Sequence, residues 1–409
     1  MVEPFYAVKC NPDVAVLRLL ASLGCSFDCA TMGEIELVLG GLGDDLSFGP
    51  RGVAGKSIVY ANPAKMEHML KFAIAGGVRM TVFDGEDELH KIAKCGGHKL
   101  DLLLRLTTDD RASICRFSKK FGCPVAEAPR LLEVAKGLGL NVAGVSFHVG
   151  SGCGDSAAYS TALEHALSVF RSAEALGMPP MTVVDLGGGF PGDTGGYGGP
   201  GMPSFQDLAR TIRSGIAAFQ GSLKCSDASN NGSVNPHPVR FIAEPGRYFV
   251  SACTVVATKV YSRKGGNGDC QALYVDDGVY GTFNSIVYDH ATPVPQKLSG
   301  YGRGRVGRLL AVSVSDDDAS ASTSSDDEAI PTAVFGPTCD GLDQMCSLET
   351  TRLPRCDVGE WLVWDDMGAY THTASFVFNV SAVFSLPPLS PFLNATLCCG
   401  AVPYAASLP

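Results

Sequence analysis

The chain has 409 residues, and its 45% hydrophobic and 18% charged residues are typical of a globular protein with a large core. A formal net charge of −10 argues against nucleic acid or an anionic membrane as the main partner. The fifteen cysteines are irregularly spaced and form no C-x-x-C pair, which favours reduced thiols over a disulfide scaffold or a zinc site. Neither a signal peptide nor an apolar run of the ~18 residues that a membrane span needs is recognisable, so we expect a cytoplasmic protein.

Residues 4–250 alternate between short apolar runs and segments with helical periodicity. The expected strands are Phe5–Lys9, Ser26–Ala30, Ile58–Asn62, Arg79–Asp84, Leu102–Thr107, Val142–Val149, Thr182–Leu186 and Arg240–Glu244. The expected helices are Asp13–Leu23, Gly33–Leu42, Lys65–Ala75, Glu86–Lys94, Ala126–Leu138, Ala158–Leu176 and Phe205–Phe219. Apolar strands that alternate with helices are typical of a parallel sheet covered on both faces. Because eight strands are expected, the sequence predicts an α/β fold with a closed, TIM-like (β/α)8 barrel over residues 1–249, in preference to an open doubly wound sheet.

The helical period fades after residue 250, and short runs of β character follow. The expected strands are Thr254–Tyr261, Ala272–Val275, Leu309–Val314, Thr332–Phe335, Trp361–Trp364 and Phe376–Phe378. We therefore expect a mostly β C-terminal domain over residues 250–385, with an acidic low-complexity insertion at 313–329 and an unassigned tail at 386–409. Lys224–His237, which contains Asn-Asn-Gly, is expected to form a loop.

Polar residues collect at the C-terminal ends of the expected barrel strands. They are Lys9, Asp28, Asn62, Asp84, Arg105, His148, Glu244 and the glycine run Gly187–Gly189. Catalytic groups of such a barrel lie at this end, because the loops that follow the strands meet there. The pattern therefore predicts an active site at the barrel mouth.

Three of these features, together with the nearby Arg247, indicate a particular chemistry. Lys9 is placed so that a partly desolvated amine forms an imine with a carbonyl compound. Gly187–Gly189 allow backbone N–H groups to approach a phosphate, and Arg247 in Glu-Pro-Gly-Arg-Tyr is suited to pair with the same anion. Glu244 in that motif is suited to keep a pyridine nitrogen protonated, which makes a pyridoxal ring an electron sink. Each feature also has an ordinary structural interpretation: a surface lysine, a tight turn, or a Glu–Arg ion pair.

Further polar residues fit the same chemistry. His148 is placed to stack on the cofactor ring, and Ser151 to reach its phosphate. Cys339 lies beside Asp340 in Gly-Pro-Thr-Cys-Asp-Gly-Leu-Asp, where a thiol is able to return a proton to a decarboxylated carbon. Asp340 and Asp289 are candidates to bind a distal ammonium group. Taken singly, a histidine or a cysteine is more often a structural residue.

The chain resembles the eukaryotic ornithine decarboxylases, which are fold-type III, alanine-racemase-like decarboxylases that depend on pyridoxal 5′-phosphate (PLP). The matching motifs, in family order from residue 4 to about 380, are PFYAVKCN, FDCAT, YANPAK, LLRLTTDD, SFHVGSGC, DLGGGFPG, AEPGRYFVSA, VDDGVYGTFNSIVYDH, GPTCDGLD and MGAYT. The resemblance implies that Lys9 carries PLP as a Schiff base and that Cys339 and His148 are also catalytic. The implied cofactor contacts are Lys9, Asp28, Arg105, His148, Ser151, Gly187, Gly188, Gly189, Glu244, Gly246, Arg247 and Tyr370.

The resemblance implies further that Asp289 and Asp340 bind the terminal amine of the substrate. In the family, Cys339 and Asp340 would come from the partner subunit, so the implied enzyme is a homodimer with shared active sites and no metal. Lys120 and Asp343 would form an ion pair between the subunits. An antizyme-like regulator is a further partner that the resemblance suggests.

The implied reaction is the decarboxylation of L-ornithine to putrescine. Three alternatives stay open: a decarboxylase of lysine or another basic amino acid, a non-catalytic regulator like the antizyme inhibitors, and a shortened chain that cannot dimerise. The last arises because relatives carry about one further strand and helix ahead of the position that matches Met1. The chain also has Val380 where the family has glycine.

Overall fold

The computed structural model describes residues 1–40, 54–192, 202–229, 238–265, 269–298, 329–376, 378–379 and 395–397, with the backbone alone for 224–229 and 395–397. The chain folds into two compact units, unit 1 from Met1 to Val250 and unit 2 from Ser251 to Pro409. The expected strand Leu309–Val314, the insertion at 313–329 except its last residue, and the tail except 395–397 lie outside the described residues.

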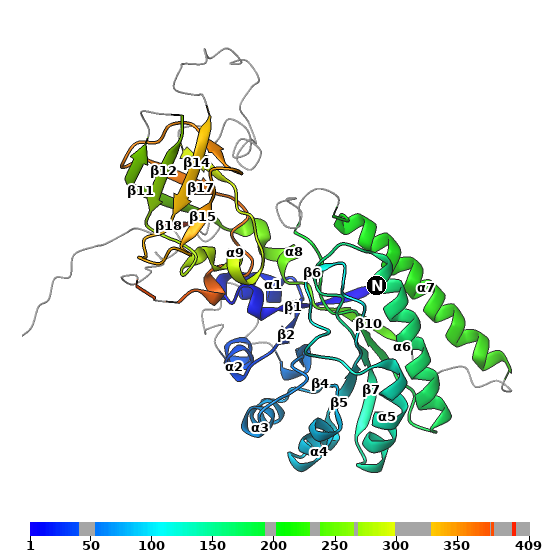
Figure 1. Ribbon diagram of the computed structural model, residues 1–409. Coiled ribbons are helices and arrows are strands. Elements are labelled where there is room, and N and C mark those ends of the chain that lie inside the picture. The colour runs from blue at the N-terminus through cyan, green and yellow to red at the C-terminus, as the bar shows by residue number, and fades with distance from the viewer. Residues whose placement is uncertain are drawn as a thin grey trace, which may run out of the picture. The chain divides into compact units, whose positions relative to one another are not determined.

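Unit 1 is built on eight parallel strands that close into a barrel (Figure 1). The strands are β1 (Val2–Ala7), β2 (Ser26–Cys29), β3 (Ile58–Tyr60), β4 (Met80–Phe83), β5 (Asp101–Arg105), β7 (Asn141–Ser146), β9 (Val183–Asp185) and β10 (Arg240–Ala243). Around the barrel they follow the order β1-β10-β9-β7-β5-β4-β3-β2. The predicted barrel and its eight strands are confirmed, and each strand ends slightly earlier than expected because the chain turns there into the loops of the mouth.

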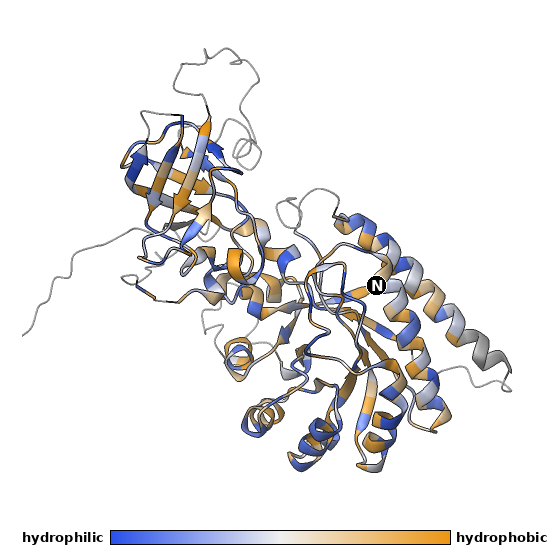
Figure 2. Cartoon of the chain, in the orientation of Figure 1, coloured by the Kyte–Doolittle hydropathy of each residue, from blue (hydrophilic) through white to orange (hydrophobic). Residues whose placement is uncertain are grey.

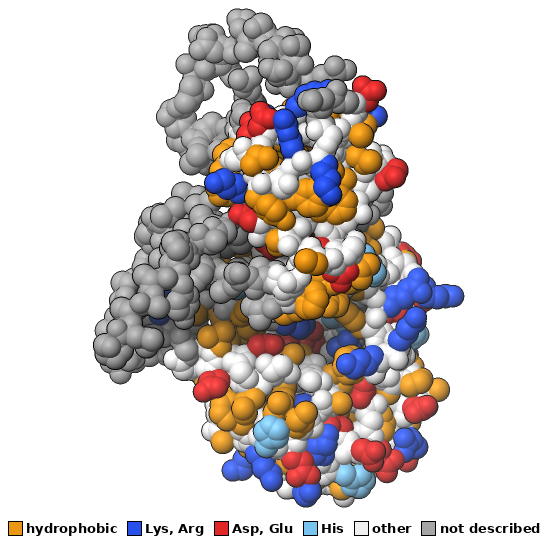
Figure 3. Space-filling view, turned by 60° about the vertical axis from the view of Figure 1, so that its left-hand side comes forward, with side chains coloured by type: hydrophobic (Ala, Val, Ile, Leu, Met, Phe, Trp, Pro, Cys, Tyr) orange, Lys and Arg blue, Asp and Glu red, His pale blue; other side chains and the backbone are white. Residues whose placement is uncertain are grey.

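Helices surround the barrel. They are α1 (Val14–Ser22), α2 (Met32–Gly40), α3 (Glu67–Ala75), α4 (Glu86–Lys94), α5 (Ala128–Gly137), α6 (Ala157–Ala175), α7 (Phe205–Ser229) and the short α8 (Arg247–Val250). The strands are mostly hydrophobic, whereas the helices mix hydrophobic and hydrophilic residues (Figure 2). On the face drawn in Figure 3, acidic and basic side chains are interspersed over the barrel surface. In the described ranges, no helix combines the length and the apolar character that a membrane crossing requires.

Two local features of unit 1 differ from the expectation. Helix α7 continues to Ser229, so the loop predicted from Lys224 is wrong over residues 224–229. The helix is long because it packs along α6, where the rings of Phe170 and Phe219 meet edge to face at 5.2 Å. A small antiparallel pair, β6 (Ser113–Cys115) with β8 (Ser151–Cys153), was not predicted. It lies in the loops after β5 and β7 and holds Ser151 at the barrel mouth.

The centre of the barrel is a small hydrophobic cluster. Its buried members are Phe5, Val59, Met80, Val82, Leu103, Val183 and Ile242. A larger cluster fills the layer between strands and helices. The interior is therefore a packed core, and only the residues above this cluster are available for chemistry.

Unit 2 contains an eight-stranded, mostly antiparallel sheet with the path β13-β17-β11-β12-β14-β15, to which β16 and β18 are added. Its strands are β11 (Val255–Gly265), β12 (Gln271–Val275), β13 (Pro295–Lys297), β14 (Ile330–Phe335), β15 (Gln344–Cys346), β16 (Arg352–Leu353), β17 (Trp361–Trp364) and β18 (Ala395–Leu397). The short helix α9 (Ser285–Tyr288) lies between β12 and β13. Trp364 is fully buried, and its indole N–H donates to Thr258 Oγ1 at 2.9 Å.

The predicted β character of unit 2 is confirmed, with one exception. Phe376 and Phe378 lie outside any strand, so the strand predicted there is wrong. Their rings pack instead on Tyr280, with centroid separations of 5.6 and 4.6 Å. Aromatic packing, not strand pairing, explains the apolar pattern at this point.

Candidate active site

A layer of polar side chains lies above the hydrophobic centre of the barrel. Arg105 of β5 is in register with Ser146 of β7, which is in register with Asp185 of β9. Side chains in register on parallel strands point to the same face of the sheet. Leu103 and Val183, two residues earlier on β5 and β9, belong to the central cluster, so this face is the barrel interior. All three polar residues are buried.

Lys9 lies in a single turn of 3-10 helix, Val8–Cys10, directly after β1. Its Nζ is 2.5 Å from Asp28 Oδ2 of β2, and the Lys9 side chain is 43% exposed whereas that of Asp28 is fully buried. Asp28 is in register with Ala7, which places the carboxylate beside the end of β1. A buried carboxylate thus holds an accessible amine at the mouth of the barrel.

Glu244 follows β10 and lies two residues beyond Ile242 of the central cluster, so it faces the same interior. Its side chain is 4% exposed, and its Oε1 has no hydrogen-bond partner among the described residues. Burial first, and then the negative charges of Asp185 and Asp28, raise the pKa of Glu244 well above its ordinary value. A buried carboxyl of this kind is suited to bind a cationic N–H group.

His148 follows β7 in the loop between that strand and β8. Its Nδ1 accepts the backbone N–H of Gly150 at 2.9 Å, and its ring meets that of Phe117 edge to face at 4.8 Å. Burial, together with the positive charges of Arg105 and Lys9, lowers the pKa of His148 well below its ordinary value. The imidazole is therefore neutral, and its proton is on Nε2.

The glycine run after β9 packs closely against the loop after β7. A Cβ added at Gly187 would lie 2.1 Å from the Phe147 carbonyl oxygen, and one at Gly189 would lie 2.6 Å from the Gly150 carbonyl oxygen. Arg247 begins helix α8 after β10, is 6% exposed, and places Nη2 3.5 Å from Ser151 Oγ of β8. Backbone N–H groups, a guanidinium and a hydroxyl from the segments that follow three barrel strands thus lie at the mouth. This donor set is suited to a phosphate.

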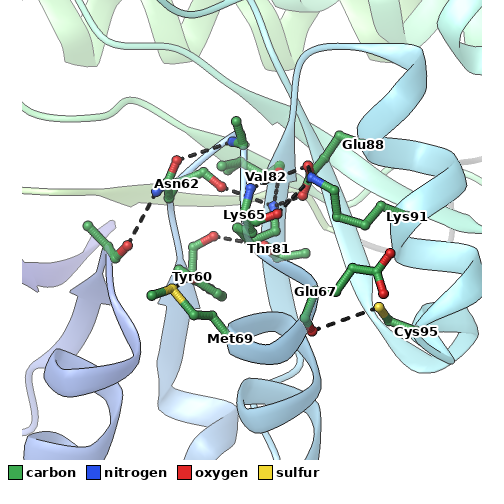
Figure 4. Close-up of polar contacts among 12 residues, drawn as sticks. Tyr60, Asn62, Lys65, Glu67, Met69, Thr81, Val82, Glu88, Lys91 and Cys95 are labelled. Carbon is green, nitrogen blue, oxygen red and sulfur yellow. Dashed lines mark hydrogen bonds and ion pairs between the residues drawn. The ribbon is translucent and has the colours of Figure 1, made fainter.

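Two of the polar residues expected at strand ends have structural roles in the described contacts. Asn62 donates to the Ala30 carbonyl at 3.4 Å and accepts the Ala64 N–H at 3.1 Å, so it shapes the loop after β3 (Figure 4). Asp84 Oδ2 accepts the Gly122 N–H at 2.8 Å. Both residues fix loops of the mouth.

Four residues that the sequence assigns to the site belong to unit 2. Cys339 is exposed, and Asp289 is 8% exposed. The carboxylate of Asp340 accepts a hydrogen bond from the Tyr280 hydroxyl and the N–H of Leu342 at 3.0 Å. Tyr370 has a φ of 55°, which is the left-handed region that few side chains adopt. Their assignment to the site stays a prediction.

The loop that carries Cys339 and Asp340 is organised around Asp343. Asp343 is 1% exposed, and its carboxylate accepts hydrogen bonds from Val279 N–H at 2.9 Å, from Thr338 N–H at 2.9 Å and from the Thr338 hydroxyl at 2.7 Å. Within unit 2 this carboxylate is therefore a structural anchor. The expected ion pair with Lys120 of a second subunit stays a prediction.

Sequence reasoning missed Asp185 and Ser146. Both end barrel strands, are fully buried, and belong to the interior layer of Arg105. Asp185 precedes the glycine run, and its Oδ1 accepts the Gly187 N–H at 2.9 Å. Burial raises the pKa of Asp185 to about 6. The signal in the sequence is the spacing of two from Val183 to Asp185, which puts the carboxyl on the same face as the apolar core.

Comparison with known proteins agrees with this site. Residues 1–251 match the family model described as "Pyridoxal-dependent decarboxylase, pyridoxal binding domain". The chain belongs to this family. It is 38% identical over 392 residues to the ornithine decarboxylase of Caenorhabditis elegans, which covers 93% of this chain and 79% of the relative. It is also 40% identical over 389 residues to antizyme inhibitor 2 of Xenopus laevis, which covers 92% of this chain and 74% of the relative.

Solved structures agree with the fold. The arginine decarboxylase of Paramecium bursaria Chlorella virus bound to agmatine superposes with a TM-score of 0.74 at 29% identity, covering 92% of this chain and 88% of that one. The lysine/ornithine decarboxylase of Vibrio vulnificus complexed with putrescine gives a TM-score of 0.72 at 28% identity, covering 97% and 87%. The predicted family and its fold, a barrel followed by a mostly β unit, are confirmed.

Proposed function

We propose that the chain is a PLP-dependent decarboxylase that converts L-ornithine to putrescine and CO2. The observation that carries the proposal is the accessible amine of Lys9 and the buried carboxyl of Glu244 in the mouth of one barrel. The ornithine decarboxylases of Caenorhabditis elegans and Neurospora crassa, both 38% identical to this chain, support the choice of substrate.

The residues of the barrel mouth fit PLP. Glu244 Oε1 is buried without a hydrogen-bond partner among the described residues, so it is available to the ring nitrogen. Gly187, Gly188 and Gly189 approach neighbouring backbone so closely that a Cβ would fill the space at each position. When bound, PLP supplies the electron sink for the electron pair that departing CO2 leaves behind. A buried carboxyl oxygen without a donor is not needed for a barrel with a purely structural role.

The chain's own residues would divide the work as follows. Lys9 attaches the cofactor through its amine, and Asp28 holds that amine in place. Arg105 and the neutral ring of His148 flank the cofactor ring, while Glu244 binds its nitrogen. The proposed phosphate contacts are Ser151, Gly187, Gly188, Gly189, Gly246, Arg247 and Tyr370.

Residues of unit 2 would complete the reaction. We propose that the exposed thiol of Cys339 returns a proton to Cα, and that Asp289 and Asp340 bind the terminal ammonium of the substrate. By resemblance, Cys339 and Asp340 would act on the barrel of a second copy, so the active form would be a homodimer. Selection of ornithine over lysine rests on one methylene group, which discriminates by only about 1–3 kcal/mol.

A second candidate is a non-catalytic regulator, because the chain is 40% identical to an antizyme inhibitor. The presence of Lys9, Glu244, Cys339 and Asp340 favours the enzyme. A regulator that acts only by binding a partner protein needs none of these groups.

The test measures CO2 release from L-ornithine, L-lysine and L-arginine by the purified chain with PLP. Borohydride reduction, followed by peptide mapping, checks the attachment point. We expect an adduct at Lys9, none in Lys9→Ala, and an unchanged adduct in the control Lys71→Ala, whose side chain is exposed on α3. Absence of any Lys9 adduct would refute the PLP proposal. An adduct without CO2 from any amino acid would favour the regulator.

A further inference from the structure

Asp185 and Glu244 form a pair of buried carboxyl groups that are tied to one glycine. Asp185 Oδ1 accepts the Gly187 N–H at 2.9 Å, and the Gly187 carbonyl accepts the Glu244 N–H at 2.7 Å. Gly187 has a φ of 63°, and the Phe147 carbonyl leaves no room for a side chain there. The connection between the two acids is therefore rigid.

One oxygen of each carboxyl group lacks a donor among the described residues. Asp185 Oδ2 and Glu244 Oε1 are buried and have no hydrogen-bond partner in the part of the chain that the structure describes. The negative charge of Asp185 acts on Glu244, so the two carboxyl groups are close enough to influence each other's protonation. Because an ionised carboxylate only accepts, two such groups hydrogen bond only when one carries a proton. Burial raises the pKa of both groups, that of Asp185 to about 6, so the pair holds a proton more tightly than either carboxyl would in water.

The charges around Glu244 balance with one such proton. Besides burial, the negative charges of Asp185 and Asp28 raise the pKa of Glu244, whereas the positive charges of Lys9 and Arg105 lower it. Lys9 is already paired with Asp28 at 2.5 Å. The positive charge of Arg105 acts on both Asp185 and Glu244, so two cations face three carboxyl groups, which favours one carboxyl that keeps its proton.

We propose that Asp185 is a positioning residue for Glu244, holding the Glu244 carboxyl through a shared proton and raising the proton affinity of the site where Glu244 would meet the cofactor's ring nitrogen. This inference rests on the proposed function. With the cofactor bound, the shared proton would pass to the ring nitrogen, so that one O–H bond breaks, one N–H bond forms, and the total charge is unchanged. Asp185 remains an anion beside the new ion pair and favours the protonated ring without touching it.

The test compares Asp185→Asn with Ser146→Ala. Asp185→Asn keeps an oxygen that accepts the Gly187 N–H, removes the charge, and replaces the second oxygen by an NH2 group that cannot share the proton. Ser146→Ala is the matched control, because Ser146 lies in register beside Asp185, is equally buried, and carries no charge. Circular dichroism and thermal unfolding establish that both variants fold.

Two measurements are made on each variant. Without cofactor, infrared spectroscopy follows the protonated buried carboxyl against pH, and Glu244→Gln identifies the Glu244 band. With cofactor, 15N NMR of PLP labelled in the ring gives the pKa of the bound ring nitrogen. In Asp185→Asn we expect the titration midpoint of Glu244 and the pKa of the ring nitrogen each to fall by about 1–2 pH units. Both should be unchanged in Ser146→Ala.

The outcomes separate this inference from the proposed function. Absence of a protonated Glu244 near neutral pH in the wild-type chain would overturn the shared proton, whether or not PLP binds. If PLP binds both chains and the ring nitrogen has the same pKa in wild type and Asp185→Asn, the positioning role is wrong while the proposed function stands. If the chain has the shared proton but binds no PLP, the proposed function fails and the assigned role of Asp185 fails with it.

Discussion

Lys65 gives the sharpest test of the physical reasoning, because it is a buried cation in the wall of the barrel (Figure 4). Its Nζ donates to the Val82 carbonyl at 2.7 Å and to the Asn62 carbonyl at 3.0 Å, and lies 2.8 Å from Glu88 Oε1. These contacts join the loop after β3 to β4 and α4. The perturbation is Lys65→Met, which keeps most of the aliphatic stem and removes the charge and the donors.

The expected magnitude has a constant part and a part that depends on pH. Removing one partner of a buried, hydrogen-bonded ion pair costs about 3–5 kcal/mol, and here Glu88 keeps Lys91 as a second partner, so about 3 kcal/mol is expected at pH 7. Burial lowers the pKa of Lys65 to about 8 from its ordinary 10.5. Between these values the unfolded chain binds the proton that the folded chain has lost, so wild-type stability rises with pH. From pH 7 to 9.5 this gain is roughly 2 kcal/mol, and Lys65→Met lacks it.

The assay is urea unfolding of wild type and variants at pH 7 and pH 9.5, followed by circular dichroism. Other groups that titrate in this range contribute equally to each chain and cancel in the difference between them. We expect the deficit of Lys65→Met to widen by roughly 2 kcal/mol at the higher pH. The control Lys91→Met removes a lysine whose side chain is 27% exposed, and should cost about 1 kcal/mol or less at both values. A Lys65→Met deficit that is independent of pH would refute the argument.

Two further substitutions test the packing of the loops. Gly187→Ala should destabilise unit 1 by about 2–4 kcal/mol in denaturant unfolding, because it combines a φ of 63° with a Cβ that meets the Phe147 carbonyl. Gly33→Ala in α2 has open space and should be neutral or slightly stabilising, so equal losses at both sites would count against the steric argument. Asp343→Ala should lower the unfolding temperature of unit 2 and speed alkylation of Cys339, because Val279 and Thr338 lose their common acceptor. An unchanged alkylation rate would mean that Asp343 does not hold the Cys339 loop.

The sequence predicted those features that the spacing of apolar residues within a single segment reveals. Every barrel strand is an apolar run, so the strand count followed directly, and that count favoured the closed barrel over an open doubly wound sheet. Lys9, Arg105 and Glu244 stood out because each is a charged residue at the end of such a run. Strands β6 and β8 were missed because three residues of mixed polarity carry no readable alternation.

Asp185 was missed for a different reason. It adjoins Gly187–Gly189, and the turn chemistry of that motif concealed the alternation that begins at Val183. Asp185 is assigned to the polar layer because it is in register with Arg105 across two strand pairings, and no single segment of the sequence contains that information. The residues of unit 2 pose the same difficulty on a larger scale, since Cys339 and Asp340 lie on a loop whose shape depends on Asp343 and Val279.

The buried acid pair also has a consequence for stability. Burial raises the pKa of Asp185 to about 6 from an ordinary 3.8, so between these values the folded chain binds more protons than the unfolded chain. Stability therefore falls as pH rises through this window, and the cost is complete above pH 6. Asp185→Asn removes that cost, and we expect the variant without cofactor to be about 1–3 kcal/mol more stable than wild type at pH 7 and no more stable at pH 4. The comparison requires urea unfolding at both pH values. If the difference in unfolding free energy between Asp185→Asn and wild type is the same at pH 4 and pH 7, the charge of Asp185 does not destabilise the fold. A gain at pH 7 would mean that the chain keeps a destabilising carboxylate in its barrel, as expected if that charge serves Glu244 and the cofactor it binds.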